Sequence, residues 1–314
     1  MRIRASGMCG SDLHFYRAPG PSGENGVMVI QGHEPCGEIV AVGPGVPEGS
    51  SKVGDRVLIH HYWGCGVCID CRTGWPQLCT GAPPRVPTIN EHGGHADYMK
   101  VPALQTMPLR DELSFRAGAA LSCGTGTAWG ALVRLGDVAG KDILVSGQGP
   151  VGLSATMLAS SLGARVIAVD ISSERLQRAS DFGADVVINP TEVDLSAAVR
   201  EVTGGRGAEL VMETSGATSA AQGALDLVAT WGKICFVGLG AEVTFRTFDT
   251  LRRQLTMLTT WTISTVELIK CADFVADRGL PIDGLFTNVW SLDEAEAAYK
   301  WFDRQSSGKG VFEM

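Results

Sequence analysis

Four cysteines lie close together in the first third of the chain. Cys65, Cys68, Cys71 and Cys79 follow the spacing C-x2-C-x2-C-x7-C. Four thiolates this near in sequence can converge on one Zn²⁺ in a tetrahedron, because thiolate sulfur is a preferred zinc ligand. Such a site has no open position for a substrate, so its role is to hold a loop that has little hydrophobic core. Two disulfides, four free thiols or an iron–sulfur cluster are the alternatives.

A glycine-rich fingerprint of the form G-x-G-x-x-G stands near the middle of the chain: Gly147-Gln148-Gly149-Pro150-Val151-Gly152. It follows a strand-like run and opens a helical one, which is the context that dinucleotide binding requires. Gly147 permits the tight turn, Gly149 lets the backbone approach the pyrophosphate, and Gly152 lets helix and strand pack closely. The phosphates would meet the unpaired N–H groups of the helix N-terminus. The alternative is a glycine-rich turn that binds no ligand.

An acidic residue, Asp170, ends the next strand-like run after the fingerprint. A carboxylate at this position accepts hydrogen bonds from the adenosine ribose hydroxyls and repels a 2′-phosphate. The sequence therefore predicts NAD rather than NADP.

Three further segments carry groups that bind metals or move protons, but they lie far apart in the sequence. They are Cys9-Gly10-Ser11-Asp12-Leu13-His14, Gly32-His33-Glu34 and Cys123. A lone cysteine or histidine is more often a buried structural residue than a ligand. These residues acquire a meaning only when they are considered together.

Together, these motifs resemble those of the zinc-containing medium-chain alcohol dehydrogenases, which include alcohol, polyol and threonine dehydrogenases. The resemblance extends over nearly the whole chain and also includes Trp261 and two segments, Phe236-Val237-Gly238-Leu239-Gly240 and Gly308-Lys309-Gly310-Val311. It implies a GroES-like β-barrel catalytic domain joined to a doubly wound, parallel-sheet Rossmann domain, with the active site in the cleft between them. It also implies a small alcohol or carbonyl substrate and a homodimer or homotetramer.

The resemblance assigns roles to individual residues. It implies a catalytic zinc held by Cys9, His33 and Cys123, with a fourth position for water or substrate, in addition to a structural zinc in the four-cysteine loop. Polyol-type relatives commonly place a glutamate at the third position, so Cys123 points to the alcohol branch. Glu34 sits beside the metal in the family and is an alternative ligand. Three more residues match cofactor contacts of the family: Thr127, Arg175 and Lys309. For Arg175 and Lys309 the alternative is a solvated charge at the surface.

The resemblance also implies hydride transfer between an alcohol and NAD(H). Zinc lowers the pKa of the alcohol, and Ser11 accepts its proton. The proton then leaves through the nicotinamide ribose and His14, whose unperturbed pKa of about 6.5 suits this exchange. Asp12 orients His33 through its second ring nitrogen. The alternatives are a polyol or amino-alcohol (threonine-type) dehydrogenase and a non-catalytic, truncated relative that binds zinc and NAD.

Two kinds of sequence pattern indicate the elements that position these residues. Short β segments between Gly and Pro turns, such as 37–43 and 55–60, predict an all-β, barrel-like unit in the first third. After about residue 124, strand-like and helical runs alternate, which indicates a doubly wound parallel sheet. The expected strands there are 142–146, 165–170, 185–188, 210–212 and 233–237. We therefore expect a catalytic zinc domain over 1–123 and 265–314 and an NAD domain over 124–264.

The composition excludes several classes of function. The formal net charge is −8 and there is no basic run, which argues against nucleic-acid or anionic-membrane binding. No apolar run is long enough to span a bilayer, and the first residues lack a signal peptide, so a cytoplasmic protein is expected. In that setting cysteines indicate metal ligands or thiols rather than disulfides. Three of the nine are expected to be buried small hydrophobes: Cys36, Cys235 and Cys271.

Two features depart from the family pattern. The chain begins inside a strand-like segment, Arg2–Ala5, and family members normally carry further strands ahead of this point. We therefore expect a shortened form with an exposed strand edge. Histidines also gather around the four-cysteine loop, with His60 and His61 before it and His95 after it. Relatives often place an apolar aromatic where His95 stands, so a polar substrate or ordinary loop histidines would explain it.

Overall fold

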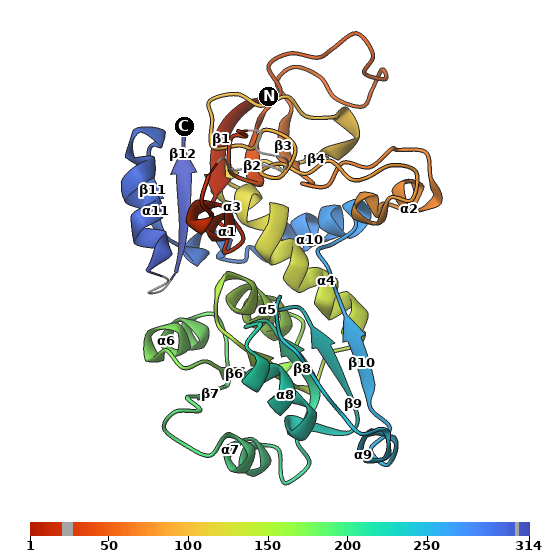
Figure 1. Cartoon of the computed structure of the whole chain (residues 1–314), viewed down its shortest axis with the longest axis vertical. Coiled ribbons are helices and arrows are strands. Elements are labelled where there is room, and N and C mark those ends of the chain that lie inside the picture. Colours follow the sequence, from red (N-terminus) through yellow and green to blue (C-terminus); the bar gives the residue numbers. More distant parts are fainter. Residues whose placement is uncertain (21–27, 305–307) are drawn as a thin grey trace. The chain divides into compact units, whose positions relative to one another are not determined.

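The computed structural model describes residues 1–20, 28–304 and 308–314 (Figure 1). The chain divides into two compact units. Unit 1 comprises residues 1–126 and 263–314, and unit 2 comprises residues 127–262. The boundaries expected from the sequence, 123/124 and 264/265, lie three and two residues from these.

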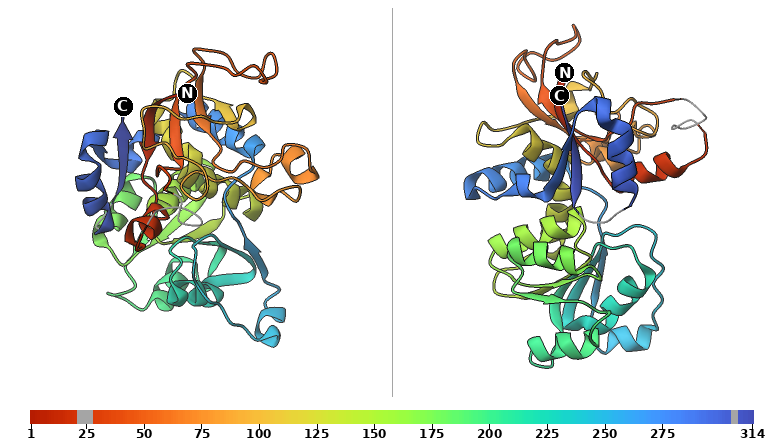
Figure 2. Two further views of the ribbon diagram at one scale, coloured as in Figure 1. Left: turned by 45° about the horizontal axis from the view of Figure 1, so that its top comes forward. Right: turned by 90° about the vertical axis from the view of Figure 1, so that its left-hand side faces the viewer.

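Unit 1 is built on a six-stranded sheet with the order β11-β12-β1-β2-β3-β4. All neighbours in it are antiparallel except β11 and β12, which are parallel. The strands are β1 (Arg2–Gly7), β2 (Glu34–Glu38), β3 (Arg56–Ile59), β4 (Thr106–Pro108), β11 (Phe286–Trp290) and β12 (Lys309–Glu313). Because β1 and β12 are neighbours, the first and last strands of the chain lie side by side (Figure 2).

The first third of the chain was predicted to be all β, but it contains helices, so that prediction was wrong, and the last segment of unit 1 contains further helices. The helical elements are α1 (Asp12–Arg17), α2 (Ile69–Arg72), η2 (Pro76–Leu78), η3 (Ala103–Gln105), α3 (Phe115–Ala120), the π-helical turn η4 (Leu121–Thr125), α10 (Thr265–Arg278), η5 (Ile282–Leu285), η6 (Leu292–Glu294) and α11 (Ala295–Asp303). The expected strand at 37–43 is also displaced, because β2 ends at Glu38. Val40 and Val42 beyond it are 44% and 40% exposed, so their alternating pattern has no sheet to pack against.

The first strand of unit 1 is not at an edge of the sheet. β1 pairs with β12 on one side and with β2 on the other. The Met1 ammonium donates a hydrogen bond to the carbonyl of Met99 at 2.7 Å. The exposed strand edge expected for a shortened form is therefore not at β1, because β12 and β2 flank it. In the described sheet the edges are β4 and β11.

Unit 2 is a doubly wound parallel sheet, as predicted. Its strand order is β10-β9-β8-β5-β6-β7, and all neighbours are parallel. The order reverses at β5 and β8, and ligands of such folds bind beyond the carboxyl ends of the strands at this point. The strands are β5 (Asp142–Ser146), β6 (Arg165–Val169), β7 (Val186–Ile188), β8 (Ala208–Glu213), β9 (Val228–Phe236) and β10 (Thr256–Thr259).

Helices alternate with these strands along the chain. They are α4 (Gly126–Leu135), which begins at the last residue of the first segment of unit 1, α5 (Pro150–Ser161), α6 (Ser173–Asp181), α7 (Leu195–Val202), α8 (Thr218–Leu227) and α9 (Thr247–Leu251). The sheet core contains Leu144, Ile167, Val211 and Ile234, all fully buried. Near-continuous apolar strands are typical of parallel sheets covered on both faces.

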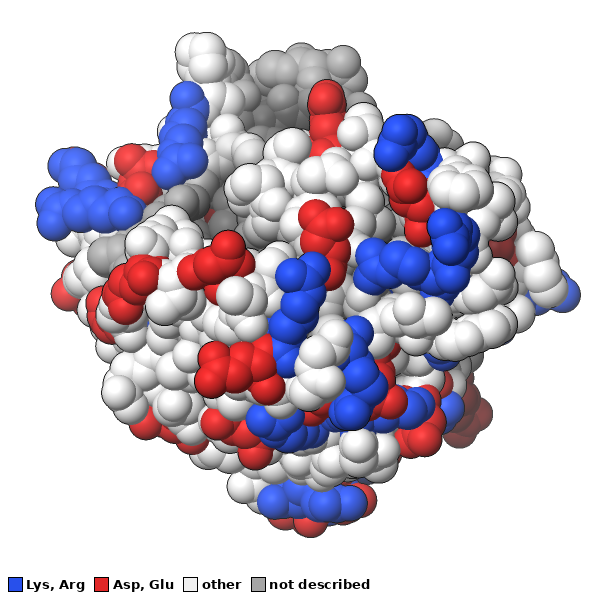
Figure 3. Space-filling model, turned by 90° about the horizontal axis from the view of Figure 1, so that it is seen from below, with Lys and Arg blue, Asp and Glu red and all other residues white. Residues whose placement is uncertain are grey.

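The surface carries mixed charge. On the face shown in Figure 3, Lys and Arg side chains are interspersed with Asp and Glu rather than gathered by sign. Many form exposed ion pairs, such as Arg165 with Asp142 at 3.0 Å, and pairs of this kind add little stability. Among the described helices, none has both the length and the apolar character needed to cross a membrane.

Candidate metal and cofactor sites

The dispersed residues predicted to bind the catalytic metal converge within unit 1. Cys9 follows β1, His33 precedes β2, Glu34 begins β2, and Cys123 lies in the π-helical turn η4. One ligand atom from each lies within 4.8 Å of the others. The sulfurs of Cys9 and Cys123 are 4.0 Å apart, close to the separation of about 3.8 Å that a tetrahedral zinc with Zn–S bonds of about 2.3 Å requires. The donor set therefore fits a zinc ion.

Asp12 fixes the orientation of two members of this group. Its Oδ1 accepts a hydrogen bond from Nδ1 of His33 at 2.9 Å, and its Oδ2 accepts one from the backbone N–H of Cys9 at 2.8 Å. With the hydrogen of the neutral ring at Nδ1, Nε2 of His33 has a lone pair to offer a metal ion among the sulfurs. A carboxylate bonded to the outer nitrogen of a ligand histidine fixes its tautomer and raises its basicity.

Ser11 and His14 lie at the start of α1 but in different surroundings. The Ser11 hydroxyl oxygen is 3.4 Å from Sγ of Cys9 and 3.4 Å from Nε2 of His33. His14 is exposed, and its backbone N–H donates to the carbonyl of Ser11 at 3.2 Å. The first turn of one helix therefore holds a hydroxyl among the ligand atoms and an imidazole at the surface.

The electrostatics of this group favour a bound cation. The contact with the Cys123 thiol holds the pKa of Cys9 well below its usual range, and the same contact with burial raises the pKa of Cys123. Burial lowers the pKa of His33, but the carboxylate of Asp12 and the thiolate of Cys9 outweigh this and raise it. Burial raises the pKa of Glu34 to about 7. A divalent cation would neutralise the negative charge that these acids crowd together.

Glu34 has a partner that the sequence did not reveal. The Lys309 ammonium, on β12, is 2.5 Å from Oε2 of Glu34 and donates to the carbonyl of Met8 at 2.9 Å. Lys309 is only 2% exposed, so the surface-charge alternative for it was wrong. Its role as a cofactor contact stays a prediction. A Cβ at Gly7 would stand 2.0 Å from Glu34 Oε2, so only glycine leaves room for this carboxylate.

The four-cysteine loop also brings its sulfurs together. Ligand atoms of Cys65, Cys68, Cys71 and Cys79 all lie within 4.8 Å of one another, and Sγ of Cys68 and Cys79 are 3.8 Å apart. The backbone N–H groups of Cys65 and Cys68 donate to sulfurs of the group at 3.3 Å. Hydrogen bonds from backbone amides, chiefly that of Cys71, lower the pKa of the Cys68 thiol to about 5. This arrangement fits a closed zinc site.

No cysteine of the chain forms a disulfide, which contradicts the disulfide alternative for the loop. The remaining three, Cys36, Cys235 and Cys271, are fully buried, as predicted. Burial raises the pKa of each of these thiols, which keeps them protonated and unreactive.

The glycine fingerprint of unit 2 has the backbone that dinucleotide binding requires. Gly147 has φ +88°, and a Cβ at Gly152 would meet the carbonyl oxygen of Gly147 at 1.8 Å. At Gly149, by contrast, an added Cβ would meet no described atom within 4 Å. Gly149 caps α5 at its N-terminus, and Pro150 and Val151 form the first turn. The open space therefore lies where the backbone would approach a pyrophosphate.

Asp170 joins the fingerprint to the next loop. Its Oδ2 accepts a hydrogen bond from the amide of Gln148 at 2.6 Å, and its Oδ1 accepts one from the amide of Ser172 at 2.9 Å. The Arg175 guanidinium lies 3.7 Å from the same carboxylate. Thr127 is buried in the first turn of α4, and no bond among the described residues joins it to the fingerprint.

Two residues that the sequence analysis missed support this end of the sheet. The buried carboxylate of Glu213, at the end of β8, accepts hydrogen bonds from the amides of Ser215 and Gly216 at 2.8 and 3.2 Å. The Thr214 hydroxyl donates to the carbonyl of Gly147 at 2.8 Å. The polar run after the apolar strand 210–212 was the available signal, since such runs end strands at a switch point.

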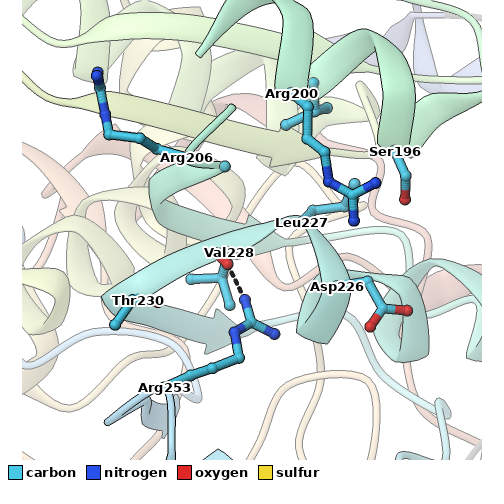
Figure 4. Close-up of a pocket in the computed structure, with 10 residues that line it drawn as sticks. Ser196, Arg200, Arg206, Asp226, Leu227, Val228, Thr230 and Arg253 are labelled. Atoms are coloured by element: carbon cyan, nitrogen blue, oxygen red, sulfur yellow. Dashed lines mark hydrogen bonds between the residues drawn. The ribbon is translucent and has the colours of Figure 1, made fainter. Parts of the chain in front are cut away.

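Unit 2 has hollows at both ends of its strands. One of about 420 Å³ lies at the carboxyl ends of β9 and β10 and is lined by residues 236–239 of the motif 236–240 and by Trp261. Another of about 310 Å³ lies at the start of β9 and beside α7 (Figure 4). There the Arg253 guanidinium donates to the carbonyls of Leu225 and Val228 at the end of α8, which satisfies groups that the helix leaves unpaired. Of these two hollows, the first is on the side of the sheet at which ligands bind in this fold, the carboxyl ends of the strands.

Two family models match the chain. Residues 1–111 match the alcohol dehydrogenase GroES-like domain, and residues 150–277 match the zinc-binding dehydrogenase model. The chain is 37% identical to the uncharacterised zinc-type alcohol dehydrogenase-like protein YphC of Escherichia coli K12, over 99% of this chain and 90% of that one. It is 30% identical to an L-threonine 3-dehydrogenase of Francisella philomiragia, over 100% of this chain and 91% of that one.

Solved structures give the same result. Alcohol dehydrogenase TADH from Thermus sp. ATN1 superposes with a TM-score of 0.90 at 29% identity, over 99% of this chain and 91% of that one. A putative zinc-binding dehydrogenase from Sinorhizobium meliloti 1021, solved with NADP bound, superposes with a TM-score of 0.86 at 27% identity, over 100% of this chain and 91% of that one. The chain belongs to the zinc-type alcohol dehydrogenase family and is an oxidoreductase with GroES-like and Rossmann domains.

Proposed function

We propose that this oxidoreductase binds two zinc ions per chain, one catalytic and one structural, and uses NAD(H) to interconvert an alcohol and its carbonyl compound. The observation that carries the proposal is the convergence of Cys9, His33, Glu34 and Cys123 within 4.8 Å around a histidine already oriented by Asp12. Three of these donors match the Cys2His set of a catalytic zinc, which leaves a position for substrate.

Each residue around the catalytic zinc has a defined task in the proposal. Cys9, His33 and Cys123 hold the ion, which when bound polarises the alcohol oxygen and lowers its pKa. The Ser11 hydroxyl, 3.4 Å from two of the ligand atoms, accepts the alcohol proton at Oγ. His14, exposed on the same helix, exchanges that proton with solvent.

Glu34 and Lys309 adjust the charge beside this zinc. The ion pair at 2.5 Å keeps the Glu34 carboxylate within reach of the ligand group, as a transient or alternative ligand. A buried charge without a partner is strongly destabilising, so Lys309 and Glu34 need one another.

NAD supplies the hydride acceptor, and Asp170 is the basis for proposing NAD over NADP. Its carboxylate repels a 2′-phosphate, whereas Arg175, 3.7 Å away, would attract one. We expect Asp170→Gly to lower kcat/KM with NAD about 10- to 100-fold while that with NADP stays the same or rises, as for the loss of a bond to a charged group. Arg175→Ala is the matched control, because it should disfavour NADP instead. An unchanged cofactor preference in Asp170→Gly would remove Asp170 from this role.

We further propose a homodimer or homotetramer. β10 is an open edge of the unit 2 sheet, and its strand contains neither proline nor a charged residue. Leu239, Phe248 and Trp261, in the surrounding segments, are 75%, 66% and 53% exposed. Open, uncharged edges pair with other strands, and two copies of one edge can pair about a twofold axis. A monomeric mass in light scattering would contradict this proposal.

The experiment that tests the enzymatic proposal combines metal analysis with an NAD reduction screen. The full chain should contain two zinc ions and reduce NAD with at least one member of a panel of primary alcohols, secondary alcohols, diols, sugar alcohols and threonine. One zinc and no turnover across the panel would instead support a non-catalytic protein that binds zinc and a nucleotide.

A further inference from the structure

Two neighbouring histidines follow β3 and use their rings differently. His60 is 1% exposed, and both of its ring nitrogens are engaged. Its Nε2 donates to the carbonyl of Ile263 at 2.8 Å, and its Nδ1 accepts the amide of Tyr62 at 3.4 Å. His61 is 4% exposed, but only its Nδ1 is engaged, with the carbonyl of Ser122 at 2.9 Å. His60 therefore has a structural role, whereas Nε2 of His61 has no hydrogen-bond partner among the described residues.

The hydrogen bond at Nδ1 fixes the chemistry of the other nitrogen of His61. A carbonyl oxygen only accepts, so Nδ1 carries the hydrogen and Nε2 carries a lone pair. No hydrogen bond from the described residues reaches this Nε2, and it is not sealed from solvent. Because this acceptor is open, a ligand or a water molecule can donate a hydrogen bond to it.

The ring of His61 lies beside the residues proposed to hold the catalytic zinc. Its ring centroid is 5.2 Å from that of His33, and the two planes are tilted by 59°. The Ser122 carbonyl that it binds belongs to the residue immediately before Cys123. His61 thus lies next to two of the proposed zinc ligands. If the carbinol oxygen of a substrate binds the zinc, a substituent on the neighbouring carbon can reach the imidazole of His61.

The half-buried His95, by contrast, has no free ring nitrogen. Nδ1 of His95 accepts the hydroxyl of Tyr299 at 3.0 Å, and its Nε2 donates to the carbonyl of Gly7 at 3.3 Å. Both nitrogens are in use, so the imidazole of His95 offers nothing to a ligand. Its sequence position suggested a polar substrate, but its hydrogen bonds give it a packing role.

We propose that His61 selects substrates that carry a hydroxyl or amino group on the carbon next to the reacting carbinol, by accepting a hydrogen bond at Nε2. The preferred substrates are therefore 1,2-diols and 1,2-amino alcohols, which share a donor at that position. This inference rests on the proposed function, because it needs a zinc-bound carbinol. A site built to bind a substrate polar group rejects analogues that lack it, because its own polar group is then left unpaired.

The test compares propane-1,2-diol and 1-amino-2-propanol with propan-2-ol in the zinc-loaded, full-length protein. We expect kcat/KM to favour the two bifunctional substrates over propan-2-ol by about tenfold or more. The variant His61→Phe keeps a ring but removes the acceptor, so the ratio of kcat/KM for each bifunctional substrate to that for propan-2-ol, measured in the same variant, should fall to about one. The variant His61→Gln, which restores an acceptor oxygen, should recover part of the preference. The difference between diol and amino alcohol identifies which donor is preferred.

A control and a binding measurement keep the inference separate from the proposed function. His95→Phe removes a half-buried histidine that has no free acceptor, so it should lower the Tm without changing the substrate ratio. Calorimetric binding of propane-1,2-diol without NAD should weaken about tenfold in His61→Phe. If wild type turns over propan-2-ol as well as the diol, or if His61→Phe leaves the ratio and the binding unchanged, this inference is overturned and the enzymatic proposal stands. If no alcohol is oxidised at all, the enzymatic proposal fails and the diol titration still decides the role of His61.

Discussion

Unit 1 holds two groups of metal ligands that differ in how they are assembled. The four-cysteine loop takes all its sulfurs from residues 65–79, and its backbone amides donate to them. The dispersed group takes its ligand atoms from residues 9–123, and ionisable side chains surround them. The loop is thus a closed site stabilised by its own backbone, whereas the dispersed group depends on Asp12 and Lys309 from elements that the sheet brings together. On the proposed function, this difference corresponds to a closed site that stabilises a loop and a site with an open position for substrate.

The largest effect should follow from removing one ligand of the dispersed group. Cys123→Ser should weaken zinc binding at the proposed catalytic site, so we expect kcat/KM to fall about 10⁴-fold or more. Enzymes accelerate reactions by about 10⁶-fold or more, so a loss of this size is within the available range. Zinc content should fall by one ion per chain while the Tm changes little. Cys271→Ala removes a buried thiol on α10 outside both groups, so it should leave zinc and turnover as they are. Full activity in Cys123→Ser would mean that the dispersed group is not the reaction centre.

The second effect concerns the Ser11 hydroxyl, which has a role only at the dispersed ligand group. Ser11→Ala should lower kcat about 10²- to 10³-fold with zinc content unchanged, which is the usual range for a lost proton-transfer group. Ser11→Thr retains the hydroxyl and should keep most of the activity. Stopped-flow measurement of NADH formation with parallel metal analysis checks both. Equal turnover in Ser11→Ala and wild type would rule out the proton relay.

The third effect tests the hydrogen bond from His33 to Asp12, a contact that has no counterpart in the four-cysteine loop. Asp12→Asn keeps the shape of the side chain but removes the charge that bonds to Nδ1 of His33. Zinc affinity at this site should weaken about 10- to 100-fold, as for other residues that orient metal ligands. Competition with a chromophoric chelator measures this affinity directly. The four-cysteine loop should retain its ion at the same chelator concentration, and loss of both ions together would contradict the separation of the two sites.

The smallest effect on turnover should come from the loop. Cys68→Ser should remove one zinc per chain and lower the Tm by about 5 °C or more, since about 2–4 °C accompanies each kcal/mol lost in a domain of this size. The folded protein should keep kcat within about threefold, because effects at separate sites are usually independent. Calorimetry and steady-state kinetics below the transition provide the comparison. A collapse of kcat in folded Cys68→Ser would show that the loop shapes the reaction centre.

The sequence alone predicted those parts of the molecule whose chemistry is local. The four-cysteine loop and the fingerprint at 147–152 follow from spacing over a few residues, and the strand 142–146 was predicted with its observed bounds. The dispersed group had no such signal, and only the resemblance to a family connected its members. The partnership of Lys309 with Glu34 was missed because it depends on β12 lying beside β1.

The errors have a similar cause. The alternation at 37–43 reads as a strand, but that segment has no neighbouring strand beyond Glu38. The helices of unit 1 are mostly short, such as α1 and α3 with six residues each, so their periodicity is too brief to distinguish from loop. His61 shows the limit most clearly, since its residue type suggested polarity but only its bonding partners distinguish it from His60 and His95.

The neighbouring positions of the first and last strands also set an order for biogenesis. A ribosome releases unit 2, residues 127–262, as one uninterrupted stretch that can begin to fold while synthesis continues. The 65–79 loop emerges earlier still and can capture its ion at that stage. Glu34, however, must wait for Lys309 in β12, which is translated about 275 residues later and then inserts between β11 and β1. The ion pair beside the dispersed ligand group can therefore form only once β12 has left the ribosome, after the folding of unit 2 can have begun.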